Sequence, residues 1–343
     1  MEYIKNSIIH RCKHPFVIGI FILYTLFILA QLQEIKYYPL KEKNDIYELA
    51  NLGETSYILK DFSPEELKEI VKDNIDKQIN DSNTTLNNRK ILETIKEQLE
   101  NKGLEELKKE YEGTEIYIWI DSFIANAKNQ FKSVDEINET VMAENYNYGY
   151  QIELQKKYLT YSQAIWAFLI IAYTYFFIKD NNGKEIIETK RIGINNGFKY
   201  YLYDITVMMI PCVLYVYLFG LVLNLYSFFR FKNAGYDILY KFTINRFVTS
   251  FVPTIMMCIA ILMLIYRVFE NNYGIAMPLY LVWMIFNVTP SIFSAPKIIN
   301  GLIVLERLDG LDTFSLSHRI IILVTAIVLL IISFYSRKGK RFG

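Results

Sequence analysis

The sequence predicts an all-α fold: a polytopic membrane helix bundle of about six transmembrane helices that carries a helical extracytoplasmic domain. Three observations lead there. Apolar residues, 52% of the chain, are gathered into runs long enough to cross a bilayer. Tyr and Phe are abundant and many stand at the ends of those runs, where their rings favour the membrane–water boundary. A single polar stretch between the first two runs is large enough to form a domain.

Six stretches approach the roughly 20 apolar residues that a helix needs to cross the bilayer core. They are Phe16–Leu32, Tyr161–Ile178, Ile205–Tyr226, Phe247–Tyr266, Ile275–Pro290 and Ile320–Tyr335. The first follows basic residues as a signal peptide would, but Ala30-Gln31-Leu32 offers no cleavage site, so we expect a retained anchor. The fifth and sixth are short, and tilt or protein contacts must help them to span.

The ends of the chain and the short loops predict the orientation. Residues 1–14 combine basic side chains with Ile4, Ile8 and Ile9, a pattern that favours a short helix lying in the membrane interface. Residues 1–32 are therefore predicted to contain this interfacial helix and the first transmembrane helix. Placing both termini inside puts more Lys and Arg on the cytoplasmic side, as the positive-inside rule requires. The basic connection between the third and fourth spans is the exception to that rule. We expect a multi-pass protein of a bacterial cell membrane with both termini in the cytoplasm.

Residues 33–158 are predicted to form the extracytoplasmic helical domain. Ser63-Pro64-Glu65-Glu66 combines a cap residue, a proline at the first helical position and a glutamate three residues after the cap. A second helix is expected to break near Gly103, and a third, from about Ile116, carries Phe131 on its apolar face and continues toward Val141. A helical stalk or small bundle is the simplest interpretation, with a ligand site as the alternative.

Sequence motifs offer no catalytic residues, no metal site and no cofactor. There is no Walker A segment, HExxH helix, GxSxG elbow or GxGxxG turn. The three histidines and three cysteines are too scattered for a metal or redox motif. A net charge of +1 gives no global field for nucleic acid. None of the six stretches has an acidic or basic residue deep inside it, which disfavours an ion-coupled relay.

The most informative short segment follows the second span, in residues 179–199. A turn at Asn182-Gly183 precedes a short charged helix that carries Ile186 and Ile187, and Gly193 ends it. Such an element lies on the cytoplasmic surface. It is either an ordinary connector or a contact for a partner below the membrane, and the residues alone leave both open.

This loop, GKEIIETKRIG, and the order of the spans resemble the permease subunits of type-2 ABC exporters. The family has a cytosolic loop of the form Gly-x-Glu-x-hydrophobic that ends near an Arg, matched here by Gly183, Glu185, Ile186 and Arg191. Where the family has Thr after the Gly and Pro before the Arg, this chain has Lys184 and Lys190. The family also has a partly re-entrant outer segment between its last two spans, the position of residues 291–318. The resemblance covers nearly the whole chain but rests on topology and one loose motif.

The resemblance implies a function, partners and site residues. Residues 159–343 would form a five-helix transmembrane region whose coupling loop docks on a separate ABC ATPase subunit. A second permease chain, identical or related, would complete the transporter. The lipid bilayer would surround both permease chains. The coupling residues would be Gly183, Lys184, Glu185, Ile186, Ile187, Glu188 and Arg191. The expected function is ATP-driven export of an amphipathic substrate, such as a peptide, an antimicrobial or a lipid-like molecule, with ATP hydrolysed on the partner chain.

Two other classes remain as alternatives. A membrane receptor or immunity protein would bind an extracellular ligand with its outer domain and would need no nucleotide-binding partner. A polytopic membrane enzyme is the least favoured, because the spans hold no nucleophile–base pairing.

Overall fold

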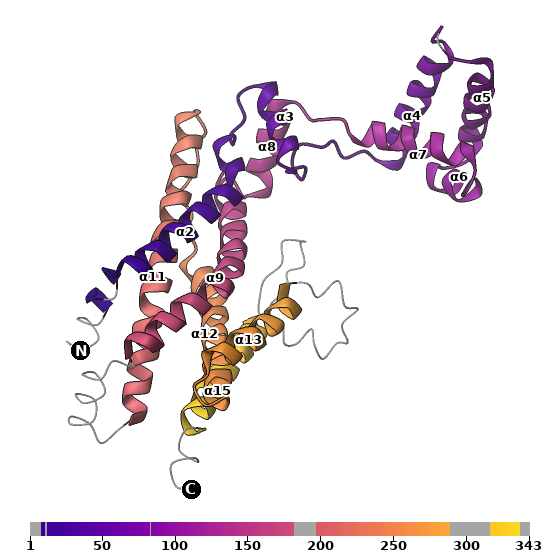
Figure 1. Ribbon diagram of the computed structural model, residues 1–343. Helices are drawn as coiled ribbons and strands as arrows, with labels where there is room; N and C mark the ends of the chain where they lie inside the picture. Colours follow the sequence, from indigo (N-terminus) through magenta and orange to yellow (C-terminus); the bar gives the residue numbers. More distant parts are fainter. Residues whose placement is uncertain (1–7, 11, 83, 182–196, 289–315, 337–343) are drawn as a thin grey trace. The chain divides into compact units, whose positions relative to one another are not determined.

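The computed structural model describes residues 8–10, 12–82, 84–181, 197–288 and 316–336 (Figure 1). Within these ranges the chain is helical with no strand, apart from an isolated antiparallel bridge between Leu59 and Phe131. This confirms the all-α prediction. The chain divides into two compact units, one made of Met1–Ile35 with Asn145–Gly343 and the other of Lys36–Glu144.

The first unit is a bundle of long apolar helices, the membrane unit. Its helices are α2 (Pro15–Gln31), α9 (Gln151–Asn181), α11 (Gly197–Asn233), α12 (Ile244–Val268), α13 (Tyr273–Val288) and α15 (Leu316–Tyr335). Helices α9, α11, α12 and α15 are long and apolar enough to cross a membrane, and α2 and α13 are shorter apolar helices. The four long helices indicate a membrane protein. Within the described residues, the first and fifth of the six expected stretches correspond to the shorter helices α2 and α13.

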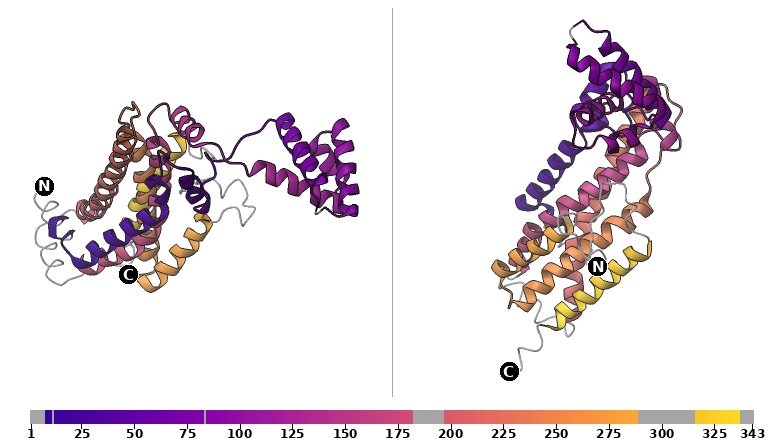
Figure 2. Two further views of the ribbon diagram at one scale, coloured as in Figure 1. Left: turned by 90° about the horizontal axis from the view of Figure 1, so that it is seen from above. Right: turned by 90° about the vertical axis from the view of Figure 1, so that its right-hand side faces the viewer.

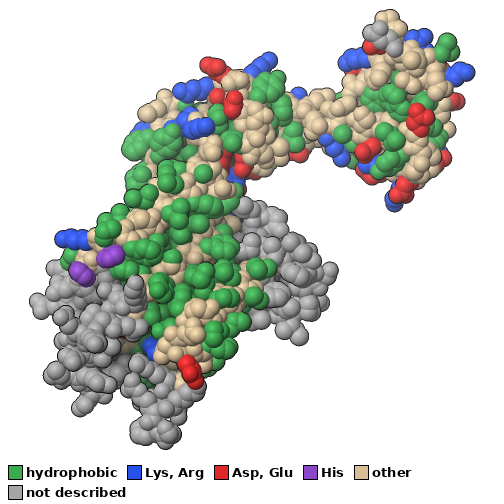
Figure 3. Space-filling view, viewed as in Figure 1, with side chains coloured by type: hydrophobic (Ala, Val, Ile, Leu, Met, Phe, Trp, Pro, Cys, Tyr) green, Lys and Arg blue, Asp and Glu red, His purple; other side chains and the backbone are tan. Residues whose placement is uncertain are grey.

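Packing in the membrane unit centres on α9 and α12. Helix α9 contacts α2, α11, α12 and α13, while α15 lies along α12 (Figure 2). Hydrophobic side chains cover much of the face of this unit that is seen in Figure 3, and many large apolar side chains of its helices are exposed. Exposed apolar side chains of this kind fit hydrocarbon rather than water.

The structure changes the start of the second span. The sequence placed a soluble segment up to residue 158 and a span from Tyr161, but α9 begins at Gln151 and is continuous through both. Gln151, Gln155 and Lys157 are buried within this helix, because partners from distant parts of the chain meet their polar groups. The compact outer unit accordingly ends at Glu144.

The second unit contains its own core. Its helices are α3 (Lys43–Asn51), α4 (Pro64–Ile79), α5 (Leu86–Asn101), α6 (Leu104–Glu110), α7 (Glu115–Lys128) and α8 (Val134–Glu144). Helices α4 to α7 bury one cluster of Leu, Ile, Val and Phe side chains. The Ser63–Glu66 capping box is confirmed: the Ser63 N–H donates to Glu66 at 2.8 Å and the Glu66 N–H to the Ser63 hydroxyl at 3.2 Å.

One helix prediction in this unit was wrong. The third helix does not continue to Val141; α7 ends at Lys128, and α8 begins at Val134 with a second capping box formed by Ser133 and Glu136. Phe131, expected on the apolar face of that helix, lies in the extended segment between them and pairs with Leu59. Pairing between distant segments overrode the local helical pattern.

Candidate functional site

The residues predicted to couple to an ATPase lie outside the described residues. Gly183, Lys184, Glu185, Ile186, Ile187, Glu188 and Arg191 all fall in 182–196, and the expected re-entrant segment 291–318 is described only from residue 316. The structure shows what flanks the loop: α9 ends at Asn181 and α11 begins at Gly197. The coupling role therefore stays a prediction.

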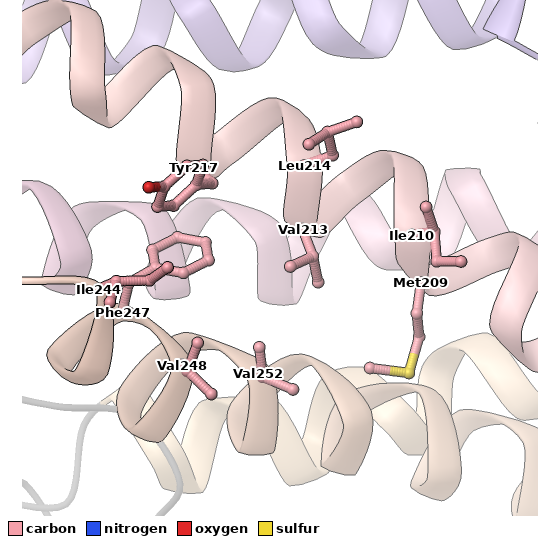
Figure 4. A pocket seen from close by; sticks show the side chains of 9 residues that line it. All are labelled: Met209, Ile210, Val213, Leu214, Tyr217, Ile244, Phe247, Val248 and Val252. Carbon is pink, nitrogen blue, oxygen red and sulfur yellow. The ribbon is translucent and has the colours of Figure 1, made fainter.

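The described residues do contain a candidate binding site, a groove of 410 Å³ between α11 and α12. Five α11 residues line one side and four α12 residues the other (Figure 4). They are Met209, Ile210, Val213, Leu214, Tyr217, Ile244, Phe247, Val248 and Val252. The spacing of three and four residues on each helix puts these side chains on facing stripes. Both helices are long and apolar enough to be candidate spans.

The groove differs in chemistry from one end to the other. The end at Met209 is aliphatic, and the Tyr217 hydroxyl marks the opposite end, where Ile244 and Phe247 also lie (Figure 4). The Tyr217 ring packs 5.5 Å from the Phe242 ring and 5.4 Å from the Phe247 ring, measured between centroids. Desolvation raises the pKa of Tyr240 in the adjoining connection, and nearby Tyr217 adds to the effect. Among the residues that line the groove, only Tyr217 carries a hydroxyl group, and it stands at this end.

The connection between α11 and α12 is held on α9 by two glutamines spaced four residues apart. The Gln151 side-chain amide donates to the Leu239 carbonyl at 2.9 Å and accepts from the Lys241 N–H at 2.8 Å. The Gln155 side-chain amide likewise donates to the Thr243 carbonyl at 2.9 Å and accepts from the Thr243 N–H at 3.2 Å. Each amide thus satisfies one backbone donor and one backbone acceptor, as a neighbouring strand would. These contacts fix the chain at the Tyr217 end of the groove.

A buried ion pair joins the end of the first apolar helix to α9. The Glu34 carboxylate lies 3.6 Å from the Lys157 ammonium, and the side chains are 3% and 10% exposed. The Tyr150 hydroxyl donates to Glu34 at 3.4 Å, and Lys157 lies over the Tyr150 ring. Two opposite charges satisfy one another here at low solvent exposure, which lowers the cost of burying either one.

Hydroxyl groups link the same helices deeper in the unit. Tyr24 donates to Tyr158 at 2.7 Å and also lies 2.7 Å from the Ser162 hydroxyl. Tyr158 in turn donates to the Val216 carbonyl of α11. These contacts do not support a role of Ser162 as a nucleophile, because the polar contact of its hydroxyl is the Tyr24 phenol rather than a base. Within the described ranges no group of three or more His, Cys, Asp or Glu side chains could hold a metal ion.

Sequence reasoning missed that the polar side chains of Gln151, Gln155 and Lys157 in α9 are buried and paired. Gln151 and Gln155 were assigned to the soluble segment, and Lys157 to its edge, because polar residues without visible partners read as solvated. The only local signal was their spacing: Gln151 and Gln155 are four residues apart, on one helical face with Tyr158 and Ser162. The groove has no signal in sequence, since its lining looks like any apolar run.

No family model matches the chain, and no curated protein or solved structure was found to be similar to it.

Proposed function

We propose that this chain is the transmembrane permease subunit of an ATP-driven ABC exporter that moves an amphipathic substrate out of a bacterial cell. In this proposal ATP is hydrolysed on a separate subunit, and a second permease chain, identical or related, completes the transporter. Both termini would lie in the cytoplasm of a cell whose plasma membrane holds the bundle. The sequence support is the GKEIIETKRIG loop and its place in the order of the spans.

The groove between α11 and α12 is the observation that carries the choice of substrate class. Its wall is apolar except for one phenol hydroxyl at an end, so it suits a molecule with a long apolar part and a polar end. An ion or a sugar would lose its hydration there without receiving compensating hydrogen bonds. The groove lies between two candidate spans, which is where a substrate entering from the bilayer would meet the protein.

The position of the loop 182–196 in the chain supports the proposal that a separate ATPase drives the transporter. It joins α9, which contacts four other helices of the unit, to α11, which forms one wall of the groove. A force applied to residues 182–196 would therefore reach the groove through two helices in direct contact. Movement of helices as packed bodies is a common way to transmit such a force.

The test is purification of the tagged full chain from its own host in mild detergent, with mass spectrometry of the accompanying proteins. The proposal expects an ATP-binding-cassette subunit in stoichiometric amount. It also expects ATPase activity of the complex to fall in the double variant Glu185→Ala, Ile187→Ala but not in Glu139→Ala, an exposed glutamate of α8. A chain that purifies without an ATPase contradicts transport and favours the receptor alternative. Unchanged activity in the double variant contradicts the coupling role alone.

A further inference from the structure

We infer that the turn 145–149, which leads into α9, lies in the lipid headgroup layer of the bilayer and that Tyr146 presents its ring to the lipids there. The inference concerns the surface of the membrane unit and does not rest on the proposed function. Three observations carry it. The turn is fixed to the membrane unit, it stands just beyond the apolar part of α11, and it exposes an aromatic ring beside a cation.

The backbone of the turn has an unusual conformation. Tyr146 and Asn147 have φ angles of 53° and 59°, in the left-handed region that is uncommon for residues other than glycine, and Gly149 has a φ of 61°. Gly149 also packs directly on α11, because a Cβ at this position would lie 2.9 Å from the Cγ atom of the Phe231 ring. Strained backbone of this kind persists only where the surrounding structure fixes it.

Hydrogen bonds to α9 supply that fixation. The Tyr148 N–H donates to the Asn145 carbonyl at 3.0 Å, which closes the turn. The Asn145 side-chain carbonyl accepts from the Glu153 N–H at 3.1 Å, and the Gln151 side-chain amide donates to the Tyr148 carbonyl at 2.6 Å. The turn is therefore a rigid part of the membrane unit, and its depth follows from the helices that it contacts.

The contacts with α11 set the depth of the turn. Asn224, inside the apolar stretch Ile205–Tyr226, donates to the Gln151 carbonyl at 3.1 Å, so α9 begins beside the last part of that stretch. Phe231, on which Gly149 packs, is five residues beyond Tyr226, or about 7 Å along the helix axis. The headgroup layer extends roughly 5–7 Å beyond the hydrocarbon core on each side. The turn therefore stands at the level of the headgroups.

The side chains of the turn suit this layer. The Tyr146 side chain is 76% exposed. The Lys241 ammonium lies 5.2 Å from the centroid of the Tyr148 ring, and Gln151 accepts from the Lys241 N–H, so a cation is held at the same level. Tyr side chains favour the membrane–water boundary because the ring has an apolar body and a polar hydroxyl. Hydrocarbon would leave the hydroxyl unpaired and water would leave the ring unburied, whereas the headgroup layer accommodates both.

Spin labelling of the full chain in liposomes of phosphatidylcholine and phosphatidylglycerol tests the inference. The background variant is Cys12→Ser, in which the two remaining cysteines are buried. Nitroxides at Leu218→Cys, Val222→Cys and Tyr226→Cys, exposed positions four residues apart on α11, calibrate depth in steps of about 6 Å. Depth is measured from the ratio of collisions with oxygen to collisions with a water-soluble nickel chelate. We expect the label at Tyr146→Cys to lie on the water side of the Tyr226 label, within about 7 Å of it.

Two results at position 146 would overturn the inference. A rate of collision with the nickel chelate equal to that of a label free in water would place the turn outside the headgroup layer. Low rates of collision with both reagents would show that protein, rather than lipid, covers this position.

A matched pair of glycine variants tests whether the contact with Phe231 sets the depth. Gly149→Ala should displace the turn and raise the nickel collision rate at position 146 several-fold, while the α11 labels keep their depths and so report a folded bundle. Gly235→Ala also changes a glycine with positive φ, but a Cβ there would meet nothing within 4 Å, so the rate should not change. An unchanged rate in Gly149→Ala would contradict the inference. None of these measurements needs ATP or a partner, so the proposed function stands or falls separately.

Discussion

The Glu34 carboxylate lies 3.6 Å from the Lys157 ammonium, although the two residues are 123 positions apart in the sequence. Glu34 follows the first apolar helix and Lys157 is in α9. The chain leaves the membrane unit just after one of them and returns just before the other. The pair therefore joins the two points of the membrane unit between which the outer unit is inserted.

Breaking this pair on one side is expected to destabilise the protein strongly. Lys157→Met leaves the Glu34 carboxylate buried without its cation, at a cost of about 3–5 kcal/mol. The measurement is the midpoint of unfolding in detergent, followed by circular dichroism. The double variant Glu34→Gln, Lys157→Met removes both charges and should recover much of the loss. Additive effects of the two single changes would contradict a direct interaction between them.

The contact between α9 and α11 at Gly220 is expected to tolerate no side chain. A Cβ at this position would overlap the Tyr158 ring, so Gly220→Ala must push the helices apart and strain the hydrogen bond from Tyr158 to Val216. Overpacking of this kind costs about 1–3 kcal/mol. The matched control is Gly19→Ala in α2, where a Cβ would meet nothing within 4 Å. Thermal unfolding should show no loss there, and a gain of up to about 1 kcal/mol is expected from helix propensity. Equal losses at both sites would refute the close contact.

Replacing Gln155 with Leu is expected to free part of the connection between α11 and α12. The change removes both the donor to the Thr243 carbonyl and the acceptor for the Thr243 N–H. Amide hydrogen exchange should therefore be faster at Thr243, with little change in the middle of α12. Lys156→Gln, the neighbouring position on α9, serves as the control. Protection of Thr243 that is unchanged in Gln155→Leu would show that the two amide contacts do not hold the connection.

The first turn of α4 is expected to loosen in acid. The Ser63 N–H hydrogen bond, and then the Ser63 hydroxyl, lower the pKa of the Glu66 carboxyl. A carboxyl with a lowered folded-state pKa adds stability that is fully present above its unfolded pKa of about 4.3 and is lost as the pH falls through the folded value. Hydrogen exchange at the start of α4 should separate wild type from Glu66→Gln at pH 7, and the two should converge in strong acid. A difference that persists in strong acid would assign the effect to packing instead. Glu136, capped in the same way by Ser133, offers an independent repeat.

Local patterns in the sequence determined much of the fold. The apolar runs marked the helices of the membrane unit, since an uninterrupted apolar helix has to be covered by lipid or protein. Ser63 and Glu66 marked the start of α4 because both partners of a capping box stand within one turn. The break near Gly103 is likewise a property of neighbouring residues, and α5 and α6 meet there.

Only the tertiary structure decided the features whose partners are far apart in the chain. Phe131 has a helical pattern around it but pairs with Leu59, and Lys157 reads as a solvated residue but lies buried against Glu34. The groove arises because stripes on α11 and α12 face one another, while each stripe alone looks like part of a span. The sequence by itself determined most of the helical segments and which of them suit a membrane, because hydrophobic periodicity and capping act within a few turns. The tertiary structure decided which polar groups are satisfied and where a ligand can fit, because both depend on contacts between helices.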